Sequence, residues 1–354
     1  MRLMRVVVAA VLVAAALEVT AVSSPAGGAA PKVEVLLSGL SSPKALSLTT
    51  IEPQGNPLVG QGAFGPPGPV LAYRLHKPDR GTAVPVSEPF NIIDLATNDD
   101  GTVWAIGGDA VLYLATPDGT ITPVLNIPDY QVTDPDPEDQ EGVPDESNPY
   151  GLTSLPDGDA LVADAANNDL LRVTQAGDVT TMARFGTEVV PTDHIPGFPE
   201  PTVTAEAVPT SVAVGKDGGV YVGELQGFPF RPGTSDIWRI EPDADGALCS
   251  LTTPDPDCQH FAGGFTAIED IAWNKRNGKL YVYELAADGV LAFEAGFETG
   301  QFPPAVLLEV SNKKRRELAA GLLSQPGGVI VGKNGDVFVT DGMFGDGRLL
   351  EVHH

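Results

Sequence analysis

The sequence has few basic residues, little cysteine and no familiar catalytic motif. Lys and Arg number 21 against 47 Asp and Glu, which gives a formal net charge of −26. So negative a field repels nucleic acid and anionic lipid, and we expect neither as a partner. There is no G-x-S-x-G or H-E-x-x-H, and no G-x-G-x-x-G opens a helical pattern. By motif, therefore, no serine hydrolase, zinc peptidase or nucleotide site is indicated.

Cysteine occurs twice, at Cys249 and Cys258. A close, even pair in an exported chain predicts one disulfide that closes a local loop. A zinc site would need more ligands than these two and the nearby His260.

The chain also lacks long apolar runs outside its N-terminus. Arg2 and Arg5 are followed by an uncharged stretch from Val6 to Leu17 and then by small residues up to Ala30. This is the layout of a secretory signal peptide, with cleavage after Ala26 or Ala30. The apolar run is shorter than the roughly 20 residues that cross a bilayer, so a membrane anchor is the weaker alternative. We predict a secreted protein whose mature chain has no membrane span.

What the chain does have is 40 Gly, 32 Pro and an internal repeat. In six places a turn glycine is followed by an apolar-x-apolar strand that ends in a fixed position six residues later. These positions are Gln61, Gly107, Asp164, Glu224, Glu284 and Asp341. Four short strands can be placed in most repeats, which predicts an all-β, six-bladed β-propeller over residues 31–354, with seven blades as the alternative.

The last repeat is incomplete. After Gly347–Val352 the chain has supplied only three of the four strands. A suitable fourth strand exists at Val33–Gly39, near the other end of the sequence. We therefore predict that the N-terminal strand completes the last blade and closes the ring, which also removes an open sheet edge.

Several segments resemble the bacterial ScyD/ScyE family of secreted proteins. The most specific is Tyr221–Phe230, which reads Y-V-G-E-L-Q-G-F-P-F, and others are Asn148–Leu152, Ile268–Trp273 and Leu280–Leu285. The resemblance covers about residues 33–352. It implies a secreted six-bladed propeller, although the family has no established general activity. A wider similarity is to NHL-repeat propellers and to the calcium-dependent lactonases of the gluconolactonase family.

The long insertions are predicted to lie on one face of the ring, because second-to-third and fourth-to-first connections share a face. They are residues 129–148, 187–207, 225–235 and 285–304. Long loops on a rigid scaffold are a usual place for binding, although they could instead pack over the channel as a plug. Candidate ligand-binding residues are Phe228, Phe230, Glu224 and Glu284, with further aromatic tips at Phe293, Phe297 and Phe302.

Acidic side chains are predicted to converge on the ring axis. Converging carboxylates repel one another unless a cation or protons intervene, and calcium accepts several oxygen ligands. Candidate metal ligands are Asp94, Asp270, Glu224 and Glu284, with calcium as the candidate cofactor. Alternatively, each acid accepts local turn amides. The loop 129–148 carries eight acidic and no basic residues and is expected to be flexible and solvated.

The leading functional hypothesis is a secreted, monomeric recognition protein that binds a small molecule, a glycan or a protein at its loop-rich face. The alternatives are a calcium-dependent, lactonase-like hydrolase and a structural envelope protein. No catalytic residue is identified from the sequence.

Overall fold

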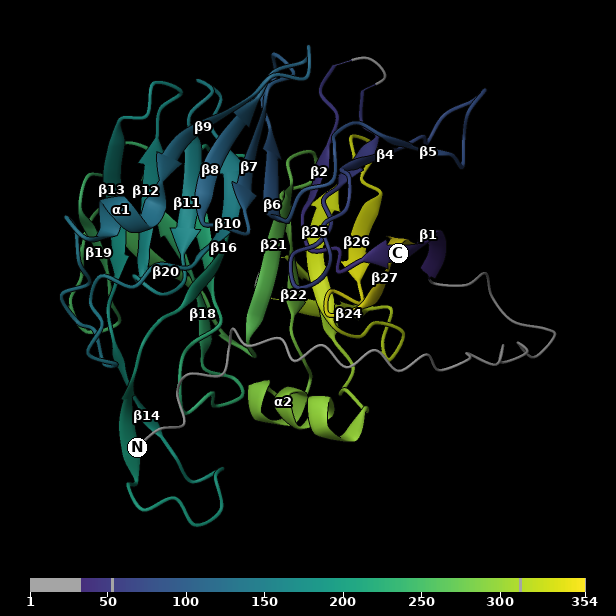
Figure 1. Ribbon diagram of the computed structural model, residues 1–354. Helices are drawn as coiled ribbons and strands as arrows, with labels where there is room; N and C mark the ends of the chain where they lie inside the picture. Colours follow the sequence, from purple (N-terminus) through teal and green to yellow (C-terminus); the bar gives the residue numbers. More distant parts are fainter. Residues whose placement is uncertain (1–32, 52–53, 312–313, 354) are drawn as a thin grey trace.

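The computed structural model describes residues 33–51, 54–311 and 314–353, so the predicted signal peptide lies outside the described part. Strands form six sheets around a common axis, each a blade, and a separate hairpin (Figure 1). The helices among the described residues are α1 (Ile127–Gln131) and α2 (Val290–Thr299). Neither is long and apolar enough to span a bilayer.

The blades are numbered in chain order, with strands given from the axis outward. Blade 1 contains β2 (Leu46–Leu48), β3 (Pro57–Val59), β4 (Leu71–Tyr73) and β5 (Ala83–Pro85). Blade 2 contains β6 (Ile92–Thr97), β7 (Val103–Gly107), β8 (Val111–Ala115) and β9 (Ile121–Asn126). Blade 3 contains β10 (Pro149–Ser154), β11 (Ala160–Asp164), β12 (Asp169–Val173), β13 (Val179–Phe185) and an added β19 (Ala247–Cys249).

The remaining blades follow the same order. Blade 4 contains β16 (Pro209–Val214), β17 (Val220–Glu224), β18 (Ser235–Ile240) and β20 (Cys258–Phe265). Blade 5 contains β21 (Ile268–Asn274), β22 (Lys279–Glu284), β23 (Val306–Ser311) and β24 (Lys314–Leu318). Blade 6 contains β25 (Pro326–Val331), β26 (Val337–Asp341), β27 (Asp346–Val352) and β1 (Val33–Ser41).

The innermost strands form a closed ring in the order β2, β6, β10, β16, β21 and β25. The predicted six-bladed propeller is therefore confirmed. The predicted closure is confirmed as well, because β1 pairs antiparallel with β27, from Val33 opposite Val352 to Ser41 opposite Asp346. The first strand of the described chain thus completes the blade that the last strand leaves unfinished.

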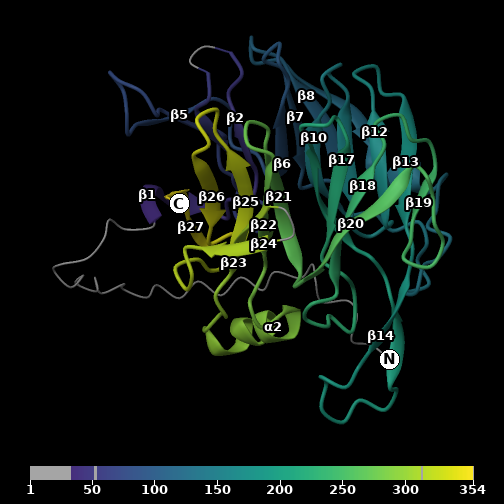
Figure 2. The same cartoon turned by 180° about the vertical axis from the view of Figure 1, so that it is seen from behind.

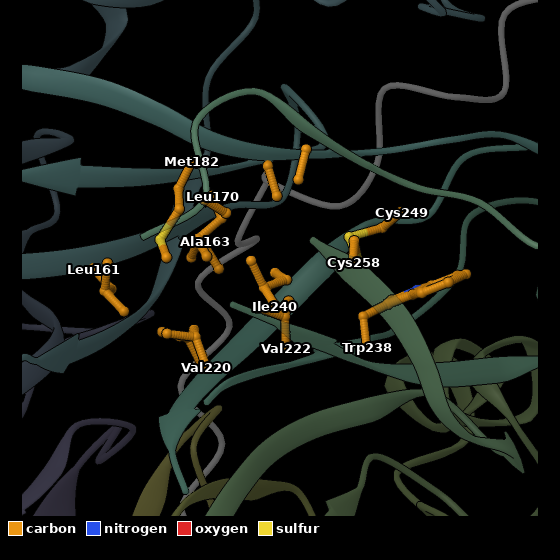
Figure 3. Packing of buried hydrophobic residues seen from close by; sticks show 14 of the residues in the cluster. Leu161, Ala163, Leu170, Met182, Val220, Val222, Trp238, Ile240, Cys249 and Cys258 are labelled. Atoms are coloured by element: carbon orange, nitrogen blue, oxygen red, sulfur yellow. A yellow bond between two sulfur atoms is a disulfide. The ribbon is translucent and has the colours of Figure 1, made fainter. Parts of the chain in front are cut away.

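The core lies between blades, and the strand period explains why. Successive side chains of a strand point to opposite faces, so a blade packed on both sides needs apolar residues at every position. In β11, Leu161 and Ala163 pack toward blade 4 with Val222 and Ile240. Ala160 and Val162 of the same strand pack toward blade 2. Figure 3 shows the interface between blades 3 and 4.

The disulfide between Cys249 and Cys258 is present, as predicted (Figure 3). Cys249 ends β19, which pairs parallel with β13 at the outer edge of blade 3. Cys258 begins β20, the outer strand of blade 4. The bond therefore links a strand of one blade's sheet to a strand of the next blade.

The long insertions gather on one side of the ring, which we call the loop face (Figures 1 and 2). It carries α2 and the hairpin of β14 (Glu188–Pro191) and β15 (Thr202–Ala205). The opposite face has short turns such as residues 155–159, which the bond from Gly158 N to Leu155 O closes at 3.0 Å.

The acidic loop 129–148 does not match the expectation of a solvated, flexible segment. Asp136 is buried, and its Oδ2 accepts a hydrogen bond from Asn168 Nδ2 at 2.9 Å. Glu138 Oε2 accepts from Thr187 N at 2.8 Å, and Asp134 forms an ion pair with Arg184. The first half of the loop is therefore docked onto blade 3, because Arg184 of β13 supplies a positive partner that the loop itself lacks and Asn168 and Thr187 supply neutral donors.

Candidate functional site

The inner strands begin with an irregularity that places side chains at the axis. In blades 2 to 5 the pairing between the first and second strands skips one residue at its start. Such a β-bulge re-aims the side chain of the unpaired residue. The skipped residues are Ile93, Tyr150, Thr210 and Glu269. Lys44 occupies the corresponding place before β2 in blade 1.

Three of these residues join alternate blades across the axis. Lys44 of blade 1 donates from Nζ to the backbone oxygen of Tyr150 of blade 3 at 3.0 Å. Its ammonium lies 3.9 Å from the centroid of the Tyr150 ring, a cation–π distance. The Tyr150 hydroxyl donates to Glu269 Oε1 of blade 5 at 2.7 Å. Lys44 and Glu269 are both buried, at 3% and 2% exposed.

Asp94 and Asp270 stand one position further along their strands and bridge neighbouring blades. Asp94 accepts from Leu95 N of its own strand and from Leu152 N of blade 3, both at 2.8 Å. Asp270 accepts from Ile271 N at 2.8 Å and from Val329 N of blade 6 at 2.7 Å. Their carboxylates therefore hold inner strands together two blades at a time. We call Lys44, Asp94, Tyr150, Glu269 and Asp270 the axial cluster.

The axial cluster contains three carboxyl groups and one ammonium group. Burial and then the nearby Asp94 carboxyl together raise the pKa of Asp270 to about 8, against the opposing effects of Lys44 and of two backbone hydrogen bonds. Burial likewise raises the pKa of Glu269 to about 7, against the effects of Lys44 and the Tyr150 hydroxyl. The pKa of Asp94 is also raised by burial. The cluster therefore changes its proton content near neutral pH, where a general acid or base is useful.

Glu224 and Glu284, predicted as partners of Asp94 and Asp270, have different neighbours. Glu224 ends β17 and accepts a hydrogen bond from Trp238 Nε1. Burial raises its pKa well above the usual value, with further contributions from Asp236 and Glu188. Glu284 ends β22 and accepts from Thr266 N at 2.8 Å. Asp94 and Asp270 are thus close enough for the charge of one to affect the pKa of the other. Glu224 and Glu284 do not join them and have other hydrogen-bond partners.

The predicted aromatic residues lie on the loop face and contact one another. Phe230 packs against a buried cluster that includes Phe293 and Met343, from the insertions of blades 5 and 6. Phe293 and Phe302 have ring centroids 5.0 Å apart. Phe228 instead contacts Phe198 of the β14–β15 connection, with centroids 5.3 Å apart. Most of the aromatic side chains therefore pack against one another, as the plug alternative predicts. Phe297 of α2 differs, because its side chain is 56% exposed.

Comparison with known proteins identifies the scaffold. No family model matches the chain, and no curated sequence is significantly similar. A glucose dehydrogenase structure matches with a TM-score of 0.55 at 15% identity, over 92% of this chain and 99% of that one. The soluble aldose sugar dehydrogenase of Escherichia coli matches with a TM-score of 0.51 at 15% identity, over 90% and 98%. Virginiamycin B lyase of Staphylococcus aureus matches with 0.51 at 14% identity, over 90% and 98%.

The chain has their fold. At these identities the similarity establishes the propeller architecture and nothing about the reaction.

Lys44, Tyr150 and Glu269 are not among the site residues predicted from the sequence. All three occupy the same place in their repeats, directly after the first residue of the inner strand segment. This shared position is the sequence pattern from which they could have been predicted. Lys44 and Glu269 are far apart in the sequence, and they become neighbours only when the ring closes.

Proposed function

We propose that this protein is an exported recognition protein that binds its ligand at the loop face. The observation that carries the proposal is the exposure of apolar side chains on the two elements that project there. Val189 of β14 is 72% exposed, and Leu291 and Phe297 of α2 are 38% and 56% exposed. Exposed apolar side chains on the projecting elements of one face are candidates for a binding surface.

The state of the axial cluster favours recognition over hydrolysis. Asp94 and Asp270 already accept two backbone hydrogen bonds each. The Lys44 ammonium supplies the positive charge that a bound metal would otherwise supply. A cluster satisfied in this way supports the inner ring, which leaves binding to the loops.

The proposal is tested with a glycan array and a small-molecule panel. We expect a ligand that binds wild-type protein and binds at least tenfold more weakly to a Val189→Asp/Leu291→Asp variant. The matched control is Ile121→Asp/Leu251→Asp, which adds the same charges at exposed apolar residues outside the loop-face insertions. A ligand that the control loses and the loop-face variant keeps would show that the proposed face is wrong.

A calcium-dependent, lactonase-like hydrolase is the second candidate. It is favoured by the excess of carboxyl groups over Lys44 in the axial cluster and by their raised pKa values. These oxygens suit calcium, which would polarise a lactone carbonyl, provided that Lys44 moves aside. The test is hydrolysis of a lactone and ester panel with and without calcium. Calcium-dependent turnover that Asp94→Asn abolishes and Glu188→Gln preserves would establish this function in place of recognition.

Export and membership of the ScyD/ScyE family belong to the same proposal. The disulfide supports an oxidising compartment, where such bonds persist. N-terminal sequencing of protein recovered from the culture medium should find a chain that begins at residue 27 or 31. Retention of Met1 on cell-associated protein would count against export.

A further inference from the structure

One residue in each blade marks a difference between the two halves of the ring. It stands directly before the glycine of the turn between the first and second strands, on the face opposite to α2 (Figure 1). In blades 2, 3 and 4 this residue is an acid, namely Asp100, Asp157 and Asp217. In blades 5, 6 and 1 it is an amide, namely Asn277, Asn334 and Gln54.

The amides can hold the turn without adding a charge. Asp217 Oδ1 accepts a hydrogen bond from Gly219 N at 3.3 Å, and Asn277 Oδ1 accepts the equivalent bond from Lys279 N at 3.0 Å. Side chains of Asp and Asn both satisfy turns of this kind. Turn formation therefore does not explain why the charge is absent from three consecutive blades.

The three amides line one continuous groove. A cavity of about 510 Å³ lies between the turns of blades 5 and 6 and is lined by Asn277 and Asn334. A second cavity of about 340 Å³ lies between blades 6 and 1 and is lined by Asn334 and Gln54. Asp336 and Glu351 line both. Small-ligand sites typically measure roughly 300–1,000 Å³. We call these two adjoining cavities the amide groove.

Each of the three blades also contributes a cation to the amide groove, and these are Arg276, Lys333 and Arg80. Among the described residues, none of the three forms an ion pair with a carboxylate, although Asp336 and Glu351 line the same groove. Elsewhere, arginines such as Arg172 and Arg348 are paired with aspartate. In a protein of net charge −26, unpaired cations in a cavity are available to an anionic ligand.

Hydrogen bonds between blades position two of these cations. Arg276 Nη1 donates to the backbone oxygen of Lys333 at 3.1 Å, from blade 5 to blade 6. Lys333 Nζ donates to Gln54 Oε1 at 2.5 Å, from blade 6 to blade 1. A guanidinium has five N–H donors and an ammonium has three, so both cations keep donors for a ligand.

We propose that the amide groove binds an acidic glycan, a sugar chain with carboxylate groups spaced along it. Its carboxylates would pair with Arg276, Lys333 and Arg80, since charge-assisted hydrogen bonds to these cations are strong. Its hydroxyl groups would donate to Asp336 and Glu351 and exchange hydrogen bonds with the amides between the cations. The groove lies on the face opposite to the loop face, so this inference does not rest on the proposed function.

The acids of the groove select against more highly charged ligands. A chain with a phosphate at every unit would place negative charge against Asp336 and Glu351, and the net charge of the protein would add to the repulsion. A chain whose charges are separated by hydroxyl groups avoids this repulsion. The alternation of cations, amides and acids therefore fits a uronate-type glycan.

Isothermal titration calorimetry of the full-length protein with oligogalacturonate at low ionic strength tests the proposal. We expect binding that weakens as salt is added, because exposed charges are screened. The same oligosaccharide with methyl-esterified carboxyl groups should bind at least tenfold more weakly, and so should polyglutamate, which has the charge but no hydroxyl groups. Absence of oligogalacturonate binding, or equal affinity for either comparison ligand, would overturn the proposal.

Variants of the turns assign the binding to the groove. Lys333→Gln and the double variant Asn277→Asp/Asn334→Asp should each weaken binding at least tenfold. The double variant should still fold, because aspartate is the native residue at this place in blades 2 to 4. Lys216→Gln is the matched control, since Lys216 is exposed at the place in blade 4 that Lys333 has in blade 6 and does not line the groove. An equal loss in the control would show that general charge attraction, and not the groove, binds the glycan.

Discussion

At the scale of single residues, Gly151 marks how closely two inner strands approach. A Cβ at this position would lie 2.6 Å from the backbone oxygen of Thr210 and 2.8 Å from the Cα of Ser211, both in the next blade. Backbone atoms cannot move aside as a flexible side chain can. Gly151→Ala should therefore lower the free energy of unfolding by about 1–3 kcal/mol, as overpacking does.

Urea unfolding of Gly151→Ala measures this cost, with Gly345→Ala as the matched control. A Cβ at Gly345 would meet nothing within 4 Å. The control should unfold like wild type. Equal effects of the two substitutions would mean that the inner strands can separate without loss.

Glu269 predicts a pH dependence of stability. Its pKa is raised to about 7 from a model-peptide value of 4.5, mainly by burial. As pH rises from about 4.5 to 7, the unfolded chain loses this proton first, so the stability that the protonated carboxyl contributes at low pH is lost. Glu269→Gln, which still accepts from the Tyr150 hydroxyl, should remove a loss of roughly 3 kcal/mol over this range.

The measurement is urea unfolding of wild type and Glu269→Gln at several pH values from 5 to 8. The free energy of unfolding of the variant, relative to that of wild type, should rise steadily up to about pH 7 and then stay constant. Profiles that run parallel over the whole range would show that Glu269 ionises normally in the folded protein.

The residues of the axial cluster show what the sequence could and could not predict. Asp94 and Asp270 were predicted because an acid recurs at one place in two repeats. Lys44 and Tyr150 were missed because their neighbours come from alternate blades, and only ring closure brings those together. Glu224 has a buried acidic partner in Asp236 because of strand register, which the repeat spacing does not define.

At the scale of elements, the disulfide and the pairing of β19 with β13 together stabilise the contact between blades 3 and 4. Replacing Cys249 and Cys258 with serine should cost about 3 kcal/mol, because the unfolded chain gains freedom and β19 loses its tether to β20. Thermal unfolding with and without reductant measures this. Wild type should become less stable on reduction, and the double variant should not respond.

Thiol titration provides the independent check on the bond. Native protein should show no reactive thiol before reduction and two after it, because the bond uses both cysteines of the chain. Two reactive thiols in exported native protein would contradict the bond, whatever the stability of the double variant.

The strands of the blades were predictable and the inserted elements were not. Repeated turn glycines and apolar strands mark the blades, but α2 has Gly296 in its middle, which weakens a helical pattern. Phe302 explains that glycine, because a Cβ there would lie 2.5 Å from its ring. The helix is therefore stabilised by its packing on the ring, which residues 285–304 alone do not reveal.

At the scale of the whole molecule, stability depends on the closure by β1. Deleting residues 31–40 should leave β27 with a bare edge and lower the Tm of the entire domain, because every blade packs on two neighbours. Differential scanning calorimetry measures this, with deletion of residues 1–30 as the control. A synthetic peptide of residues 31–41 should restore part of the Tm. An unchanged Tm would contradict closure by this strand.

The same closure behaves differently under mechanical load. Val33 and Val352 are paired at one end of the β1–β27 ladder. Tension applied to these two residues therefore breaks the hydrogen bonds of the ladder one after another from that end. Tension between blades 3 and 4 instead acts on the pairing of β13 with β19, while the bond between Cys249 and Cys258 keeps β19 joined to β20. A ring that heat can open only as a unit would thus yield first at blade 6 when it is pulled, at a force far below that needed to shear a blade.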